Sequence, residues 1–412
     1  MQAVTKRTGW ALDALNFSLA DVRDGLGPYL AIYLLAVHQW DQASIGVALS
    51  ASAIAGLVAQ TPGGALVDAL RAKRGLVVAA ALAVTFSCLV VPMVTGFWPV
   101  VLTQGLAGIA QSVFAPAIAA ITLGVVGRAA FARRTGRNES FNHAGNAFAA
   151  AAAGALSYLF GPIVVFWLLA GMALASIVAV LAIPAEAIDH DVARGLDAGA
   201  TRQEGEPSAW SVMLANRPLL VFAVCVVLFH FANAAMLPLV GQKLAARDAN
   251  QGTALMSVCI VAAQLVMVPM AMLAGAKADT WGRKPLFLGG FLVLAARGAL
   301  YTLSDDPYWL VVVQMLDGVG AGLFGALFPV IVADLTRGSG HFNISLGAIA
   351  TAQGIGASLS QAAAGFVVVA AGYSAAFLAL GGIAALGALL FRWQMPETRP
   401  GTVSDSTALA PA

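Results

Sequence analysis

Two short stretches of this chain, 211 residues apart, share a pattern, and each follows a long apolar run. Residues 64–74 read GALVDALRAKR, and residues 275–284 read GAKADTWGRK. Both place Gly and Asp at positions i and i+4 and then a cluster of basic side chains. A loop repeated at half the length of a membrane protein is typical of folds built from two copies of one unit, as in secondary transporters. The repeat therefore predicts a duplicated membrane-spanning fold.

The rest of the chain supplies the spans that such a fold requires. Of its 412 residues, 60% are hydrophobic and only 10% are charged, against about 25% charged residues in soluble proteins. A transmembrane helix needs about 20 mostly apolar residues. The runs of this length predict an all-α membrane protein with 12 transmembrane helices in two pseudo-symmetric six-helix bundles, at 10–37, 43–67, 75–95, 98–126, 138–160, 162–183, 217–244, 252–274, 285–303, 307–335, 342–370 and 373–392.

A long polar stretch divides the chain into two halves. We interpret residues 184–216, which are rich in acidic side chains, as a cytoplasmic linker. The predicted organisation is a bundle at 1–183, this linker, a second bundle at 217–393 and a flexible cytoplasmic tail at 394–412. Most of the 22 Lys and Arg residues fall on the side that holds the N-terminus, so both termini are predicted to be cytoplasmic. These features indicate a multi-pass protein of a bacterial inner membrane.

The two predicted halves align beyond the repeated loops. Gly145 and Gly154 in the fifth predicted span match Gly356 and Gly365 in the eleventh, again 211 residues apart. Parallel halves of this kind imply a pseudo-two-fold axis along the membrane normal and a cavity between the halves.

The second loop fits the signature G-x-x-x-D-(R/K)-x-G-R-(R/K), with Thr280 in place of the first basic residue. In the first loop, Ala69 and Arg71 occupy the first basic position and the second Gly position. Residues 396–399, PETR, are similar to a C-terminal motif of the same family. On these motifs the chain resembles the major facilitator superfamily over essentially its whole length. The resemblance implies alternating access with a cytoplasmic gate formed by Gly64, Asp68, Arg71, Gly275, Asp279, Gly282, Arg283 and Lys284.

Motif remnants in the fourth and fifth spans are most similar to the drug/metabolite:proton antiporter branches of this family. Gln104 and Gly105 are present, but the Arg that this branch carries three residues earlier is Val101 here. The remnants favour export and leave the antiporter subtype open.

The first predicted span carries three charged residues near its middle, Asp21, Arg23 and Asp24. A charge at the bilayer centre costs at least about 2.5–3.5 kcal/mol on insertion scales, so this cluster needs partners or water. Two carboxylates and one guanidinium leave one negative charge unmatched, as a proton carrier requires. We predict proton coupling or substrate binding here. The alternative is a static ion-paired brace beside the Gly25–Pro28 break.

Uncharged polar side chains in other spans are predicted to line the substrate cavity. Asn142 and Asn146 share one face of the fifth span, and His230 and Asn233 share one face of the seventh. For each residue, hydrogen bonding between helices is the alternative. The predicted cavity residues are Asn142, Asn146, His230, Asn233, Gln104, Gln353 and Gln361.

Arg297 and Asp317 lie on consecutive antiparallel spans at comparable predicted depths. We interpret them as a structural ion pair, although Asp317 could also reach the cavity.

The sequence therefore predicts a proton-coupled exporter of a small polar or anionic organic molecule, such as a siderophore, a carboxylate or a drug-like compound. The alternatives are an uptake symporter for a sugar or organic acid and a non-transporting membrane sensor. No nucleophile–base pair, phosphate loop or metal-ligand spacing is evident, so we predict no enzyme activity, catalytic residue, cofactor or metal site. A net charge of +2 does not indicate nucleic acid. We expect a monomer whose partners are the substrate, protons and the lipid bilayer.

Overall fold

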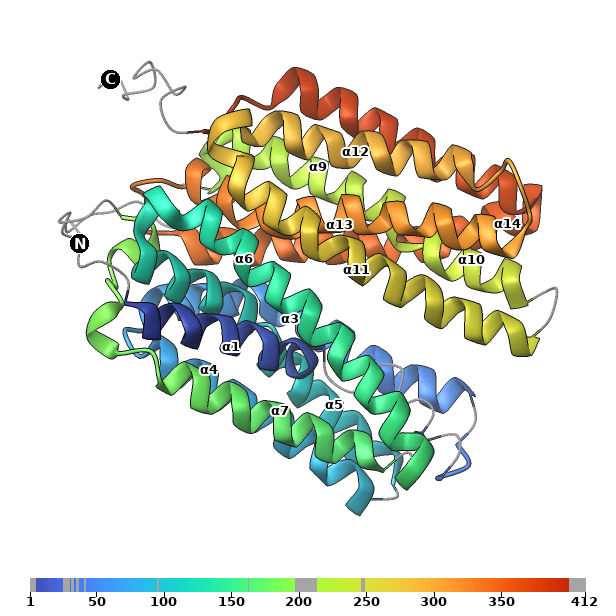
Figure 1. Cartoon of the computed structure of the whole chain (residues 1–412), viewed down its shortest axis with the longest axis horizontal. Helices are drawn as coiled ribbons and strands as arrows, with labels where there is room; N and C mark the ends of the chain where they lie inside the picture. Colours follow the sequence, from blue (N-terminus) through green and yellow to red (C-terminus); the bar gives the residue numbers. More distant parts are fainter. Residues whose placement is uncertain are drawn as a thin grey trace. The chain divides into compact units, whose positions relative to one another are not determined.

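The structure is a computed structural model of the chain (Figure 1). It describes residues 5–24, 30, 33–34, 37–40, 42–94, 96–161, 163–196, 213–245 and 249–399. Regular structure in this part of the chain is entirely helical, which confirms the predicted all-α class. The α-helices are α1 (Lys6–Asp24), α3 (Gln42–Ala69), α4 (Lys73–Val90), α5 (Phe97–Gln111), α6 (Phe114–Phe160), α7 (Val164–Leu181), α9 (Arg217–Ala234), α10 (Met236–Ala245), α11 (Ala249–Trp281), α12 (Arg283–Leu300), α13 (Pro307–Leu335) and α14 (Phe342–Gln394).

The two longest helical stretches each contain two predicted spans. The candidate membrane-spanning stretches at residues 97–157 and 342–394 are 61 and 53 residues long, far more than the ~20 residues that one crossing needs. Gly127 and Gly372 interrupt them with φ of 68° and 84°, a backbone conformation that favours glycine. Seven of the stretches within the described residues are long and apolar enough to cross a membrane.

Contacts divide the chain into two compact units. Unit 1 comprises Met1–Phe131, Phe141–Glu206 and Gly338–Thr351, and unit 2 comprises the remaining residues. Two helices, α6 and α14, contribute residues to both units. A short part of α6, at 132–140, belongs to unit 2, and the start of α14 belongs to unit 1.

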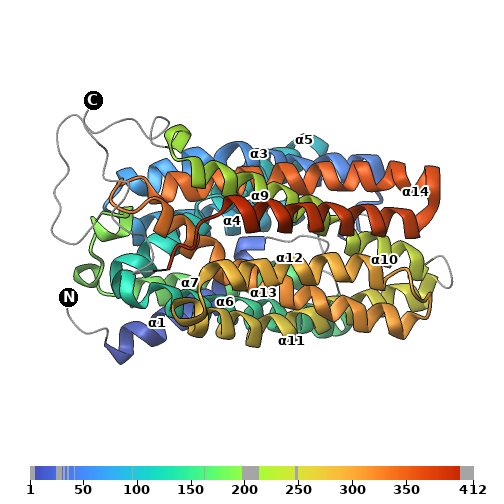
Figure 2. The ribbon, with the colours of Figure 1, turned by 90° about the horizontal axis from the view of Figure 1, so that it is seen from above.

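The same helix pairs pack in both units. In unit 1, α3 packs against α5, and in unit 2 their counterparts α11 and α13 pack together. Figure 2 shows α11, α12 and α13 running lengthwise beside one another. Gly145 of α6 contacts the backbone carbonyl of Phe17 in α1, and Gly356 of α14 contacts that of Val227 in α9. A Cβ at either glycine would overlap this carbonyl, so the repeated glycines allow close helix contact.

Backbone breaks are repeated as well. Gly127 and Gly338 both have positive φ and lie 211 residues apart, and so do Gly161 and Gly372. Gly127 and Gly338 lie between the fourth and fifth and between the tenth and eleventh predicted spans. Gly161 and Gly372 lie between the fifth and sixth and between the eleventh and twelfth. The duplication predicted from two loops therefore extends to the positions at which the chain turns.

Two polar segments are more ordered than their composition suggests. The start of the predicted linker forms two short 3-10 helices, Ala185–Ala187 and Val192–Arg194, packed within unit 1. Residues 395–399, predicted to begin a flexible tail, include the buried side chains of Met395 and Thr398. Both segments hold backbone or side-chain contacts that position the candidate gate.

Candidate functional site

The carboxylate of Asp68, in the last turn of α3, caps the start of α14. One oxygen accepts hydrogen bonds from the Asn343 backbone N–H at 3.3 Å and from Asn343 Nδ2 at 2.8 Å. The other accepts from the Ile344 N–H at 2.8 Å. The first N–H groups of a helix have no partner within the helix, and a negative charge there is favoured by the helix dipole. Asp68 thus joins the first repeated loop to a helix 275 residues away.

Small residues make this contact possible. A Cβ on Gly64 would overlap the backbone carbonyl of Asn343, and one on Gly347 would overlap the carbonyl of Gln60. The glycine of the signature is therefore required because α3 and the first turns of α14 touch backbone to backbone.

The predicted linker buttresses the capped end of α14. Asn343 Nδ2 also donates to the Ala193 carbonyl at 2.9 Å, and the Gly338 N–H donates to the Gly195 carbonyl at 2.8 Å. The segment itself is fixed by the Asp189 N–H, which donates to the Gly124 carbonyl at 3.0 Å. Residues 189–196 therefore connect α6 to α14 within unit 1.

The basic residues of the first loop serve separate purposes. Lys73, only 1% exposed, donates to the Leu70 carbonyl at 2.9 Å. Arg74 donates to the Ile183 carbonyl at 2.5 Å, just after the end of α7, where a cation is favoured by the helix dipole. Arg71 is exposed.

The environment of Asp68, just beyond the predicted span 43–67, shifts its ionisation. Burial raises the pKa of its carboxyl group from 3.8 to about 6, although hydrogen bonds from Ile344 and Asn343 oppose the shift. Desolvation penalises the charged form, whereas donors to the carboxylate favour it. Burial in this contact thus holds the pKa of Asp68 at about 6.

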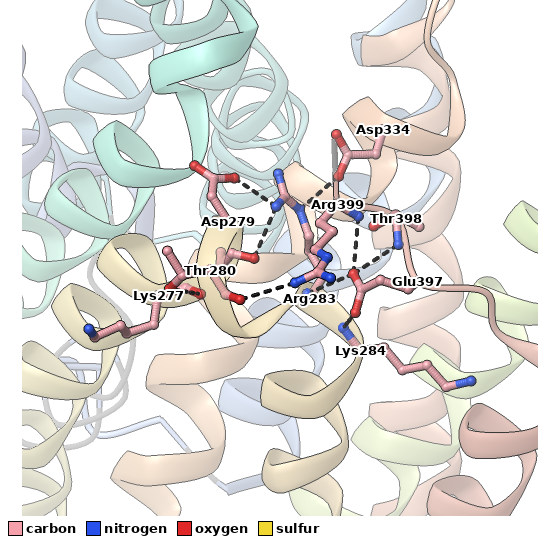
Figure 3. A network of polar contacts seen from close by, with 10 residues as sticks. Lys277, Asp279, Thr280, Arg283, Lys284, Asp334, Glu397, Thr398 and Arg399 are labelled. Atoms are coloured by element: carbon pink, nitrogen blue, oxygen red, sulfur yellow. Dashed lines mark hydrogen bonds and ion pairs between the residues drawn. The ribbon is translucent and has the colours of Figure 1, made fainter. Parts of the chain in front are cut away.

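The second repeated loop is held by charges of unit 2 itself (Figure 3). Arg283 pairs with Asp279 at 2.7 Å and with Asp334 of α13 at 2.9 Å. The Arg283 guanidinium is almost completely buried, while the Asp279 side chain is 42% exposed. Arg283, not Asp279, is the centre of this cluster.

Glu397, just after α14, caps the start of α12. Its carboxylate accepts from the backbone N–H groups of Arg283 at 2.9 Å and Lys284 at 3.2 Å. It also accepts from the N–H groups of Thr398 and Arg399 (Figure 3). The segment after the last helix is thereby attached to the second signature.

The two glycines of the second signature have distinct roles. Gly282 precedes α12 with φ of 98°, in the left-handed region that favours glycine. Gly275 of α11 packs against Gly136 of α6, where a Cβ would lie 2.8 Å from the Gly136 Cα. This is the counterpart in unit 2 of the contact that Gly64 makes in unit 1.

A buried polar network lies within the membrane-spanning helices of unit 2. Arg297 of α12, 1% exposed, forms an ion pair with Asp317 of α13 and donates through Nη2 to Asn233 Oδ1 at 2.6 Å. Gln314 donates to the other Asp317 oxygen at 3.1 Å and accepts a hydrogen bond from Tyr301. The two residues predicted as an ion pair and Asn233, a predicted cavity residue, thus belong to one network.

His230 lies one turn before Asn233 on α9 and is half-buried. Its Nδ1 lies 3.1 Å from the Val226 carbonyl, and its ring contacts Phe324 edge-on at 4.6 Å. The position of the imidazole is therefore fixed by the backbone of its own helix and by an aromatic neighbour.

The other predicted site residues differ in their burial. Asp21, Arg23, Asn142, Asn146 and Gln353 are half-buried, and Gln104 is buried. The side chains of Asp24 and Gln361 lie outside the described residues.

Several residues of these sites were not predicted from the sequence. Asn343, Asp334 and Ala193 carry no local motif, because their importance arises only from contacts between segments distant in the chain. Glu397 lies in the PETR motif, which signalled the family but not the helix that Glu397 caps.

The sequence model of the Major Facilitator Superfamily matches residues 12–276 and 222–410. The chain is 62% identical, over 96% of its length and 95% of the relative's, to an uncharacterized MFS-type transporter of Mycobacterium tuberculosis (strain ATCC 25618 / H37Rv). A stretch of 74 residues, 18% of each chain, is 38% identical to multidrug resistance protein MdtH of Yersinia enterocolitica.

Two solved structures have a similar fold over nearly the whole chain. The proton:xylose symporter XylE, bound to 6-bromo-6-deoxy-D-glucose, has a TM-score of 0.69 at 13% identity and covers 95% of this chain and 96% of its own. The human organic anion transporter MFSD10 has a TM-score of 0.64 at 16% identity, with 93% and 97% covered. At these identities the likeness shows the fold alone.

Proposed function

The chain belongs to the major facilitator superfamily, whose members are membrane transporters and not enzymes, and we propose that it is a proton-coupled exporter of a small polar or anionic organic molecule. The proposal places the protein in a bacterial inner membrane as a monomer with both termini in the cytoplasm. The local similarity to a multidrug resistance protein supports export.

The observation that carries the proposal is that ionisable side chains lie within membrane-spanning helices of both units. Asp21 and Arg23 lie on α1 of unit 1, and Arg297 pairs with Asp317 in unit 2. Charged groups inside a bilayer are costly and commonly mark proton or substrate pathways. We assign proton coupling to the α1 cluster of Asp21, Arg23 and Asp24, with Arg23 as the cation for an anionic substrate.

The contact between Asp68 and α14 is the proposed cytoplasmic gate. It consists of three hydrogen bonds on one carboxylate, each with a net worth of only about 1 kcal/mol because water competes for the same groups. Such a contact is strong enough to favour one state and weak enough to break during transport. In the second loop, Asp279, Arg283 and Lys284 are assigned to the same gate.

Export driven by protons is tested in inside-out membrane vesicles with an imposed pH gradient, acid inside. A panel of radiolabelled organic acids and amines is offered, and the wild type is expected to accumulate at least one of them in a gradient-dependent manner. Asp21→Asn should abolish this accumulation, while Glu186→Gln, a change of an exposed linker acid, should leave it intact.

The same experiment separates the alternatives. Accumulation only in right-side-out vesicles with acid outside would identify an uptake symporter. Absence of gradient-dependent flux in both orientations would instead favour a non-transporting sensor. Accumulation that survives Asp21→Asn unchanged would contradict the assignment of proton coupling to α1.

A further inference from the structure

Two polar atoms on one face of α9 have no partner among the described residues. They are Nε2 of His230 and Nδ2 of Asn233, three positions apart on the helix. Both residues are half-buried, and neither atom is one of the fully buried unpartnered atoms of the described residues. Side chains at i and i+3 are neighbours, about 5–6 Å apart at their Cβ atoms. The pair can therefore contact a single small group.

The hydrogen-bonding character of each atom is fixed by what its side chain already contacts. A backbone carbonyl can only accept, so His230 Nδ1 carries the proton toward Val226, and the neutral ring has an acceptor lone pair at Nε2. Arginine can only donate, so the Asn233 atom that faces Arg297 is the oxygen, and Nδ2 presents two N–H donors. The face therefore offers one acceptor and one donor.

This face is directed away from the exposed apolar side of the helix. Leu220 and Val224, the strongly exposed apolar residues of α9, lie about 130° around the helix from the midpoint of His230 and Asn233, at 100° per residue. Unpartnered polar groups directed at lipid would be costly. The pair is placed to meet a polar ligand.

The neighbouring charges determine that this ligand group is uncharged. The Arg297 guanidinium is already occupied by Asp317 and Asn233 and by Met236 Sδ at 3.3 Å. Since Asp317 balances its charge, the Arg297 guanidinium is not free to bind a ligand carboxylate. A ligand cation would find both Asp317 oxygens already bonded, to Arg297 and Gln314.

We propose that His230 and Asn233 bind an uncharged group of the transported molecule that carries a donor and an acceptor on neighbouring atoms. Asn233 Nδ2 donates to the acceptor oxygen of this group, and His230 Nε2 accepts its hydroxyl or amide hydrogen. A primary carboxamide or a pair of adjacent hydroxyl groups has this chemistry. The inference rests on the proposed transport function and specifies a part of the substrate that the α1 cluster does not contact.

The test measures binding of two pairs of probes to the full-length protein in lipid nanodiscs by saturation-transfer NMR. The pairs are benzamide with N,N-dimethylbenzamide, and trans-1,2-cyclohexanediol with its dimethyl ether. In at least one pair, the unmethylated probe is expected to bind at least about tenfold more tightly than the methylated one. Methylation removes the N–H or O–H group that donates a hydrogen bond to His230 Nε2.

Two variants assign this selectivity to the pair. His230→Phe retains an aromatic ring against Phe324 and loses the acceptor, and Asn233→Asp retains an oxygen toward Arg297 and loses both donors. Each variant should reduce the preference for the unmethylated probe to less than about twofold, because that preference arises from the hydrogen bond that the variant cannot form. His230→Gln, which restores an acceptor, should recover part of it, and Phe231→Leu on the same helix is the matched control. Thermal unfolding of each variant verifies that it is folded.

Equal binding within both pairs, no binding of any probe up to its solubility limit, or full selectivity in the folded variants would overturn the inference. The measurement uses no pH gradient and no transport. A failed flux experiment with Asp21→Asn would therefore leave this result standing, and a negative binding result would leave proton-coupled export standing.

Discussion

Asp68 and Asp279 occupy equivalent positions in the two repeated loops, yet their partners differ. Asp68 is buried and accepts three hydrogen bonds from the start of α14, whereas Asp279 is 42% exposed and pairs with Arg283 four residues later. The glycines beside them behave alike, since Gly64 and Gly275 both pack backbone to backbone on a distant helix. The same packing therefore supports two different electrostatic arrangements.

The difference follows from where the facing helix begins. After Gly338 the chain forms α14 only from Phe342, so the N–H groups of residues 343 and 344 are free to be capped. After the equivalent Gly127, helix resumes at once. The N–H groups at 132 and 133 then lie inside a helix and bond to carbonyls one turn earlier. Asp279 consequently has no helix end to cap, and its carboxylate forms an ion pair with Arg283 instead.

The largest expected effect comes from adding a side chain at Gly64, where α3 and the start of α14 pack backbone to backbone. Gly64→Ala would place a Cβ into the Asn343 carbonyl, and overpacking of this kind costs about 1–3 kcal/mol. Thermal unfolding of the purified protein should show a clear loss of stability. Gly105→Ala is the control, because a Cβ there meets nothing within 4 Å. An equally stable Gly64→Ala protein would show that α3 and α14 do not touch as described.

Removal of the two aspartates tests the comparison directly. Asp68→Ala should cost about 1–2 kcal/mol, as for loss of a helix cap, and should expose the start of α14. Asp279→Ala should cost less than about 0.5 kcal/mol, as for an exposed ion pair. The readout is the labelling rate of a cysteine introduced by Ser345→Cys, a position that is fully buried. Similar labelling in both variants would mean that the two loops are equivalent after all.

The pH dependence of the first contact should be opposite to that of an ordinary paired carboxylate. The pKa of Asp68 is raised by burial to about 6 in the contact and returns toward 3.8 when the contact opens. The closed contact binds more protons, so its stabilisation is fully present below pH 3.8 and is lost as the pH rises through 6. Acidification from pH 7 to 5 should favour it by about tenfold.

The fraction of molecules with this contact closed can be measured with one spin label at the C-terminal end of α3 and one at the start of α14. Electron paramagnetic resonance then gives the distance between the two labels. Asp68→Asn should abolish the pH dependence, and Asp279→Asn should preserve it. A contact that opens on acidification would reverse the sign of the assigned shift.

The smallest expected effect concerns the cap that only the second loop has. Glu397→Ala removes the acceptor for the Arg283 and Lys284 N–H groups and should cost about 1 kcal/mol. Faster proteolysis after residue 394 should accompany it, while labelling of the Ser345→Cys thiol stays unchanged. Coupled changes at both places would indicate that the two loops act as one.

Much of the fold could be predicted from hydrophobic run length. The predicted span 307–335 coincides with α13, and the predicted spans 342–370 and 373–392 fall on either side of Gly372 in α14. The signature glycines and aspartates also identified the loops that touch distant helices. The sequence did not reveal that Arg297, Asp317 and Asn233 form one network, because each lies in a different span and only packing brings them together.

The sequence by itself was enough to predict the spans, because they are continuous runs of apolar residues. It was also enough to predict the duplication and the family, because short repeated motifs indicate both. The tertiary structure alone decided which partner each aspartate of the repeat takes. The first N–H groups of a helix have no partner within that helix. Whether they face a carboxylate depends on the residue at which a distant segment begins its helix. Asp68 meets such an end at Asn343, and Asp279 meets Arg283.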